Sequence, residues 1–146
     1  MERRKFLKNT GMAGILATAT APAFAQASPT IKWRCASSFP KSLDTIYGAA
    51  ETAAKVVSEV TGGKFQIQVF AAGEIVPGLQ ALDAVSNGTV EMCHTVSYYY
   101  VGKDPTWAFG TCLPFGLNFR QHNAWWLEAG GHELMQKDFY DKQGLI

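Results

Sequence analysis

The spacing of apolar residues alternates between strand-like and helix-like from residue 31 to residue 96, and this alternation restricts the possible folds. Three short β-prone runs predict strands, at residues 31–37, 65–70 and 90–96. Between the first two, apolar residues at three- and four-residue spacing from Ser42 to Val60 predict a long amphipathic helix. A shorter helix is predicted over Leu79 to Ser86, with Leu79, Leu82 and Val85 facing inward.

The order β-α-β-α-β indicates an α/β fold with a parallel sheet, because helices between successive strands require parallel pairing. The crossovers are expected to be right-handed. Ligands of such sheets bind outside the carboxyl ends of the strands. We therefore expect three loops to form a rim there, at residues 37–40, 71–74 and 97–100. Two of these loops lead into helix N-termini, which favour an anion.

Three consecutive tyrosines, Tyr98, Tyr99 and Tyr100, follow the third predicted strand. Alternation along an extended chain predicts that Tyr98 and Tyr100 point to one side and Tyr99 to the other. At most two of them would then face the ligand edge. A tyrosine combines an apolar ring with a hydroxyl that can bond a carboxylate or keto oxygen. The alternative is that all three are packing residues near the rim.

The remainder of the chain is rich in aromatic residues and predicts further helices. They cover residues 120–129 and 132–142, with a break at Gly130-Gly131. Leu145-Ile146 then suggests the first step of another strand.

The first 25 residues have the features of an export signal. A basic region is followed by a weakly apolar run and by Ala23-Phe24-Ala25, a small-x-small cleavage pattern. The basic stretch contains the twin-arginine motif Arg-Arg-x-Phe-Leu-Lys, beginning at Arg3. We expect a twin-arginine signal peptide over residues 1–25 and a periplasmic mature chain over residues 26–146. The alternative is a disordered basic N-terminus of a cytosolic protein.

Charge and hydropathy exclude several classes of partner. The whole chain has 13 Lys and Arg against 12 Asp and Glu. Without the predicted signal the totals become 9 and 11, formally −2, with no charge runs. Nothing here favours nucleic acid or an anionic membrane, and no apolar run predicts a membrane span. Cys35 and Cys93 lie within apolar strand-like runs, so free buried thiols are expected for them and for Cys112.

Motifs for catalysis or metal binding are not found in the sequence. It contains no Gly-x-Ser-x-Gly, no phosphate-binding loop and no metal-ligand spacing of His and Cys. His94 lies inside a predicted strand and is expected to be a hydrogen-bonded core histidine. Asp83 and Glu91 lie in different elements and form no evident acid–base pair. A secreted enzyme is therefore the remote alternative.

Longer stretches resemble one known family. "WRCASSFPKSLDTIYGAAE", "FQIQVFAAGEIVPGLQALDAVSNGTVEMCHTVSYYYVGKDPTWAF" and "LPFGLN" are similar to the extracytoplasmic solute receptors of TRAP transporters, in particular the 2-oxoacid-binding branch. The resemblance covers the chain from Ile31 onward. It implies a two-lobed α/β receptor that closes on a small organic acid, such as pyruvate, and delivers it to a membrane permease.

The resemblance also limits what this chain can contain. Family members are about twice as long, as two domains of this size would be, so residues 26–146 are expected to form the first lobe. The family's carboxylate-pairing arginine, and the ligands of a monovalent cation beside the substrate, come from the second lobe. No cofactor or metal is therefore assigned within this chain. A truncated, non-binding fragment of such a receptor is the alternative.

Four residues are candidates for substrate contact. Tyr100 matches a position that contacts substrate in the keto-acid receptors, with Tyr99 as its neighbour. Phe39 and Glu74 lie on the other two loops of the same rim. For Glu74 the alternative is a solvated loop carboxylate, or a cap on the helix that opens at Pro77-Gly78.

Overall fold

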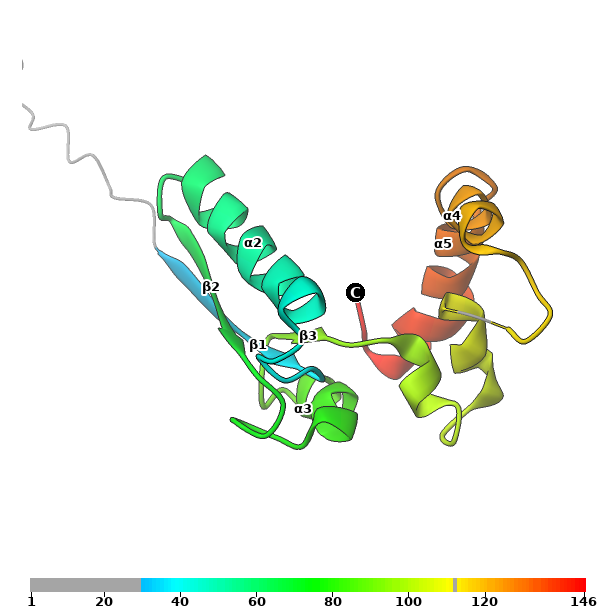
Figure 1. Cartoon of the computed structure of the whole chain (residues 1–146), viewed down its shortest axis with the longest axis horizontal. Helices are drawn as coiled ribbons and strands as arrows, with labels where there is room; N and C mark the ends of the chain where they lie inside the picture. The colour runs from blue at the N-terminus through cyan, green and yellow to red at the C-terminus, as the bar shows by residue number, and fades with distance from the viewer. Residues whose placement is uncertain (1–29, 112) are drawn as a thin grey trace, which may run out of the picture.

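The computed structural model describes residues 30–111 and 113–146, and a parallel three-stranded sheet forms its first half (Figure 1). The strands are β1 (Ile31–Ser37), β2 (Phe65–Phe70) and β3 (Met92–His94), in the order β2-β1-β3. β1 pairs with β2 from Ile31↔Phe65 onward and with β3 from Cys35↔Met92 onward. The predicted α/β class and parallel sheet are confirmed. The third strand is shorter than predicted.

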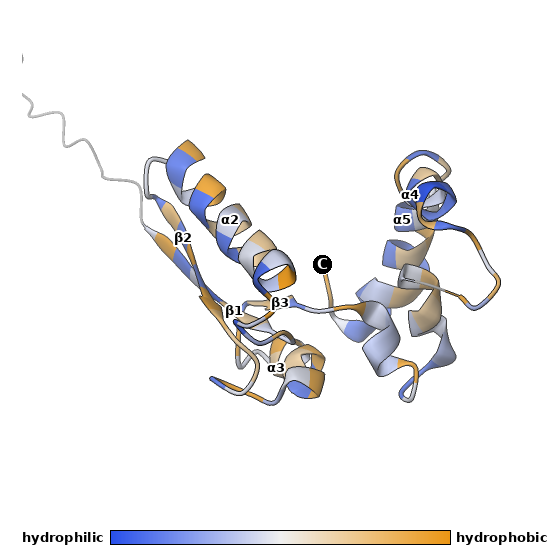
Figure 2. Ribbon diagram, in the orientation of Figure 1, coloured by the Kyte–Doolittle hydropathy of each residue, from blue (hydrophilic) through white to orange (hydrophobic). Residues whose placement is uncertain are grey.

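The two helices between the strands differ in regularity. Helix α2 (Asp44–Val60) packs along β2 and buries Tyr47 and Ala54, and hydrophilic and hydrophobic residues alternate along its ribbon (Figure 2). The second predicted helix is divided into a 3₁₀ turn, η1 (Gly78–Gln80), and helix α3 (Ala81–Ser86). The prediction that Leu79 faces inward is wrong, because Leu79 lies in the 3₁₀ turn and is 63% exposed.

The second half of the described chain is helical and lies beyond β3 (Figure 1). Asn118 caps helix α4 with a complete capping box, and Gly130 adopts a left-handed conformation that ends the helix, as the Gly130-Gly131 break predicts. The predicted helix over 132–142 is a succession of α, π and 3₁₀ turns. The elements of this half are η2 (Ser97–Tyr100), η3 (Pro105–Gly110), α4 (Phe119–Glu128), α5 (Gly131–Met135), η4 (Gln136–Tyr140) and η5 (Asp141–Gln143).

One apolar cluster joins the two halves. Leu82 of α3 packs with Tyr100 and Trp107, and Met135 and Phe139 complete the buried set. The ring of Trp107 meets those of Tyr100 and Phe139 edge-on, with centroids 5.5 and 4.8 Å apart. The helical half is thus attached to the sheet half through α3.

Two predictions about extended backbone are wrong. The tyrosines do not continue β3; Ser97–Tyr100 forms a 3₁₀ turn, in which the Tyr99 N–H donates to the Val96 carbonyl (3.2 Å). The side-to-side alternation predicted for the three rings therefore does not apply. Leu145-Ile146 forms no strand, and the Leu145 N–H donates to the carbonyl of Tyr140.

Both described cysteines have free thiols, as predicted. Burial raises the pKa of Cys35 and of Cys93 to about 11 in each case. Cys112 and the predicted signal peptide lie outside the described residues. None of the helices in the described part of the chain has the length and apolar character that crossing a bilayer requires.

Candidate functional site

The three loops that follow the strands meet, as the topology predicts. The N–H of Ser38, after β1, donates to the carbonyl of His94 at the end of β3 (2.8 Å). The N–H of Ala72, after β2, donates to the carbonyl of Phe39 (3.1 Å). Backbone hydrogen bonds therefore connect the β1 loop to both neighbours and form a rim at one edge of the sheet.

Phe39 lies at the centre of this rim. Its side chain is 5% exposed and packs with Tyr47 of α2 and Ala71 of the β2 loop. Its ring centroid lies 5.1 Å from that of His94 and 6.2 Å from that of Tyr99. Phe39 thus forms an apolar floor on which elements from all three strands converge.

Beneath that floor, His94 is hydrogen-bonded within the protein. Its Nδ1 lies 3.1 Å from Oγ of Ser37, which also accepts the N–H of Phe39. Burial lowers the pKa of His94 below its ordinary value, which favours the neutral imidazole at neutral pH. His94 is hydrogen-bonded within the protein as predicted, but it is half-buried and does not belong to the buried core.

Glu74 is held by two partners on the rim. One carboxylate oxygen accepts Nζ of Lys41 (2.6 Å), and the other accepts the N–H of Ala71 (2.7 Å). The hydrogen bond from Lys41, followed by that from Ala71, lowers the pKa of Glu74. Glu74 thus closes its own loop and brings the Lys41 ammonium, which sequence reasoning missed, to the rim.

The three tyrosines have different environments. Tyr100 is 2% exposed, and its hydroxyl lies 2.8 Å from Oγ1 of Thr95 and accepts the N–H of Leu82 (3.3 Å). Tyr99 is half-buried, faces Phe39 and meets Tyr98 edge-on at 4.9 Å. Tyr98 is 42% exposed. The structure therefore brings Phe39 and Tyr99 together at the rim and turns Tyr100 toward the helical half.

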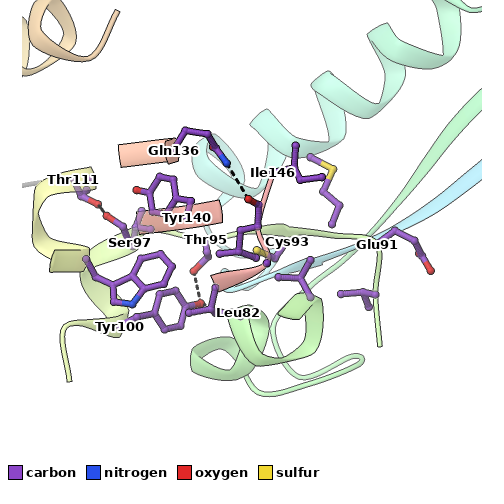
Figure 3. Close-up of a pocket in the computed structure, with 18 of the residues that line it drawn as sticks. Leu82, Glu91, Cys93, Thr95, Ser97, Tyr100, Thr111, Gln136, Tyr140 and Ile146 are labelled. Carbon is purple, nitrogen blue, oxygen red and sulfur yellow. Dashed lines mark hydrogen bonds between the residues drawn. The ribbon is translucent and has the colours of Figure 1, made fainter. Parts of the chain in front are cut away.

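A pocket of about 940 Å³ lies between β3 and the helical half (Figure 3). The hydroxyls of Ser97 and Thr111 are hydrogen-bonded to each other there, and Nε2 of Gln136 donates to the carbonyl of Leu145 (2.9 Å). Among the described residues that line the pocket, Glu91 is the single charged side chain.

Glu91 is already paired, and this limits what the pocket can bind. Its carboxylate accepts hydrogen bonds from Nη2 of Arg34 (2.6 Å) and from Nε of the same side chain (3.1 Å). It also receives the backbone N–H of Arg34 at 2.8 Å. Hydrogen bonding to Arg34 lowers the pKa of Glu91 to about 2. The pocket therefore supplies hydroxyl groups and apolar walls but no cationic side chain, so it cannot itself neutralise a carboxylate.

Acid–base and metal chemistry find no support in the described residues. Asp83 pairs with Lys103 at 2.6 Å and Glu91 pairs with Arg34 at 2.6 Å, so each carboxylate is engaged with a separate cation. Within residues 30–111 and 113–146, no cluster of three or more His, Cys, Asp or Glu side chains could hold a metal ion. The rim itself brings together the Phe39 and Tyr99 rings and the Lys41–Glu74 ion pair.

Comparison with known proteins gives one consistent result. Residues 36–146 match the family model described as bacterial extracellular solute-binding protein, family 7. A monocarboxylate 2-oxoacid-binding periplasmic protein of Nostoc sp. (strain PCC 7120) is 50% identical over 143 residues. That alignment covers 94% of this chain and 39% of the relative. The chain therefore spans about two fifths of the curated relative's length.

Solved structures give the same answer. A TRAP transporter solute-binding protein from Bordetella bronchiseptica RB50, with copurified calcium and picolinate, is 51% identical with a TM-score of 0.75. One from Pseudoalteromonas atlantica T6c, with sodium and pyruvate, is 34% identical with a TM-score of 0.74. One from Colwellia psychrerythraea, with calcium and pyruvate, is 31% identical with a TM-score of 0.75. Each superposition covers 79% of this chain and 34–35% of the other.

Proposed function

Because the chain belongs to the bacterial extracellular solute-binding proteins of family 7, we propose that it contributes the first lobe of a receptor for a small 2-oxoacid such as pyruvate. The family and the neighbouring structures are solute-binding receptors, not enzymes, and the curated relative is periplasmic. The sheet and its helices correspond to one lobe of a two-lobed fold. In this proposal residues 26–146 are that lobe, and a TRAP membrane permease receives the ligand.

The observation that carries the proposal is the rim, where an apolar floor and polar groups from three loops converge. Phe39 supplies the floor, Tyr99 supplies a ring and a hydroxyl, and Lys41 supplies a cation. A 2-oxoacid such as pyruvate combines a short apolar tail with a carboxylate and a keto oxygen. The rim offers an apolar surface and a hydroxyl for the tail and the keto oxygen, while the Lys41 ammonium is paired with Glu74 and the carboxylate-pairing arginine is expected from the second lobe.

The ligands of the neighbours narrow the substrate class. Picolinate and pyruvate each carry a carboxylate next to a second electron-pair donor, a ring nitrogen in one and a keto oxygen in the other. Such a pair of donors can chelate a cation, and the neighbours contain calcium or sodium. We therefore propose that the complete receptor holds a cation beside its ligand, without restricting it to a monovalent ion. No ligand to that cation is assigned among the described residues.

The four candidate residues take different roles in this proposal. Tyr99, half-buried at the rim, contacts the ligand, and Phe39, which is 5% exposed, supports the Tyr99 ring from below. Glu74 fixes the position of Lys41 and of its own loop. Tyr100 acts from beneath the rim, because its hydroxyl is already bonded to Thr95 and Leu82.

A chimeric receptor tests the proposal. Residues 36–146 would replace the matching part of the Bordetella bronchiseptica protein, and calorimetry in calcium-containing buffer would compare pyruvate with propionate, which lacks the keto oxygen. We expect the chimera to bind pyruvate at least tenfold more tightly than propionate, since one hydrogen bond to a charged partner contributes ~1.5–3 kcal/mol. A folded chimera that binds neither acid, or both equally, would contradict the proposal.

We also propose that export follows the twin-arginine route. The motif that begins at Arg3 motivates this, together with the cleavage pattern that ends at Ala25. Replacing Arg3 and Arg4 with lysine should leave the precursor in the cytoplasm, whereas the unmodified chain should begin at Gln26 in the periplasmic fraction. Immunoblotting of cell fractions measures export. If the double variant still reached the periplasm, the twin-arginine route would be excluded.

A further inference from the structure

Four polar contacts follow one another beneath the rim. The N–H of Leu82 lies 3.3 Å from the Tyr100 hydroxyl oxygen, which lies 2.8 Å from Oγ1 of Thr95. Oγ1 of Thr95 lies 2.6 Å from Oγ of Ser38, and that atom lies 2.7 Å from the carbonyl oxygen of Gly78. Figure 3 shows the link between Thr95 and Tyr100. Three hydroxyls therefore connect a backbone donor to a backbone acceptor.

Counting protons gives one arrangement in which every link is filled. The Leu82 N–H can only donate and the Gly78 carbonyl can only accept, while each hydroxyl has one proton to give. Three hydroxyl protons must therefore fill the three links after Leu82. All three links are filled when Tyr100 donates to Thr95, Thr95 to Ser38, and Ser38 to Gly78; the Ser38 hydroxyl is also oriented to donate to Thr95, and its one proton then leaves the Gly78 carbonyl. Reversing the link between Thr95 and Ser38 leaves the Ser38 hydroxyl oxygen and the Gly78 carbonyl oxygen in contact without a proton between them, which is costly for part-buried groups.

Both ends of this series lie on the same short segment. In a continuous α-helix the Leu82 N–H would donate to the carbonyl four residues earlier, which is that of Gly78. Here the segment changes from the 3₁₀ turn η1 to helix α3, and the Gly78 carbonyl accepts the N–H of Ala81 instead. The N–H of Leu82, in the first turn of α3, then lacks a backbone acceptor within the helix. The three hydroxyls complete this junction through residues on the loops after β1 and β3.

We infer that Ser38, Thr95 and Tyr100 form one connected hydrogen-bond chain, and that Thr95, at its centre, is a positioning residue for the rim. Tyr100 ends the 3₁₀ turn that carries Tyr99, and Ser38 directly precedes Phe39. The Thr95 hydroxyl joins these two segments, so it sets the approach of Tyr99 to Phe39, whose ring centroids are 6.2 Å apart. The effect on the ligand rests on the proposed function, whereas the hydrogen-bond chain does not.

Three variants of the chain test this inference. Thr95→Val removes the hydroxyl at nearly constant shape, and Thr95→Ser keeps it. Thr52→Val is the matched control on the exposed surface of α2. In the chain as given, NMR should detect slowly exchanging hydroxyl protons of Ser38, Thr95 and Tyr100. Thr95→Val should abolish the slow exchange at Ser38 and Tyr100 and speed amide exchange of Leu82 by about tenfold or more. Thr95→Ser should restore both.

Ligand binding gives a separate readout in the chimeric receptor. Thr95→Val should weaken pyruvate binding by about tenfold, and Thr95→Ser should restore the affinity. If Thr95→Val fails to fold, Ser38→Ala takes its place and should likewise accelerate exchange at Leu82. Hydroxyl and amide exchange that match those of Thr52→Val would overturn the hydrogen-bond chain. An altered exchange with unchanged pyruvate affinity would overturn the positioning role, and a chimera that binds no pyruvate even before mutation would instead refute the proposed function.

Discussion

Replacing Gly78 with alanine should destabilise the fold, whereas replacing Gly48 with alanine should stabilise it. A Cβ added to Gly78 would lie 2.7 Å from the carbonyl oxygen of Ser38 and 3.3 Å from its carbonyl carbon. Both are backbone atoms, so a side-chain rotation cannot relieve the clash. A Cβ added to Gly48, inside α2, would have no heavy atom within 4 Å. At Gly78 the substitution therefore tests a close approach between two backbone segments, and at Gly48 it tests helix propensity alone.

The magnitudes follow from these two environments. At Gly48 alanine should stabilise the fold by about 0.5–1 kcal/mol, which is the usual helix-propensity difference between the two residues. At Gly78 the same gain is opposed by overpacking of ~1–3 kcal/mol. Displacement also weakens the bond from the Ser38 hydroxyl to the Gly78 carbonyl, which contributes about 1 kcal/mol. Gly78→Ala should therefore destabilise the fold by roughly 1–3 kcal/mol.

Urea unfolding followed by far-UV circular dichroism measures both changes. The transition midpoint should fall for Gly78→Ala and rise for Gly48→Ala, with unchanged slopes. A Gly78→Ala variant at least as stable as the unmodified chain would show that the 3₁₀ turn can move away from Ser38 without loss. The inference that Gly78 must lie close to the backbone of Ser38 would then be wrong.

Three further predictions concern charge, thiols and binding. Hydrogen bonding holds the pKa of Glu91 at about 2, below its unfolded value. The contribution of Glu91 to the free energy of unfolding should therefore be complete above about pH 4.5 and be lost as pH falls toward 2. Glu91→Gln should flatten that part of an acid-unfolding curve. With thiol pKa values of about 11, Cys35 and Cys93 should react with Ellman's reagent at pH 8 mainly after unfolding, as absorbance would show in a Cys112→Ser background. The 146-residue chain alone should show no rise in melting temperature with pyruvate, since a clamshell site takes contacts from both lobes; a clear rise would contradict this.

The sheet and its rim could be predicted because local patterns specify them. Residues 31–37 and 65–70 alternate or cluster in the way that strands require, and both strands occupy the predicted residues. Helix α2 has a long apolar stripe, and the paired glycines Gly62-Gly63 after it both take positive φ. Once the order of elements was known, parallel pairing was required, and so was the meeting of the three loops.

The directions of side chains at the rim could not be predicted in the same way. Alternation is a property of extended backbone, and it does not hold for Tyr98 to Tyr100 because distant contacts impose a 3₁₀ turn. The Tyr100 hydroxyl accepts the N–H of Leu82, eighteen residues earlier, and its ring packs on Trp107. Likewise, the ion pair between Glu74 and Lys41, thirty-three residues apart, was not predicted from the sequence. These partners are set by the tertiary fold.

The separate environments of Tyr99 and Tyr100 lead to a last expectation about the site. Tyr100→Phe leaves the Leu82 N–H without its acceptor and removes one of the two hydrogen-bond partners of the Thr95 hydroxyl, so it should lower the free energy of unfolding by about 1–3 kcal/mol. In the chimeric receptor it should also weaken pyruvate binding, by displacing the rim. Tyr99→Phe removes a hydroxyl from a half-buried ring at the rim, so it should reduce affinity by about 0.5–1.5 kcal/mol and leave stability nearly unchanged. Calorimetric titration and urea unfolding of both variants distinguish direct contact from support. If Tyr99→Phe altered stability and not affinity, Tyr99 would be a packing residue and the ligand contact would have to lie elsewhere on the rim.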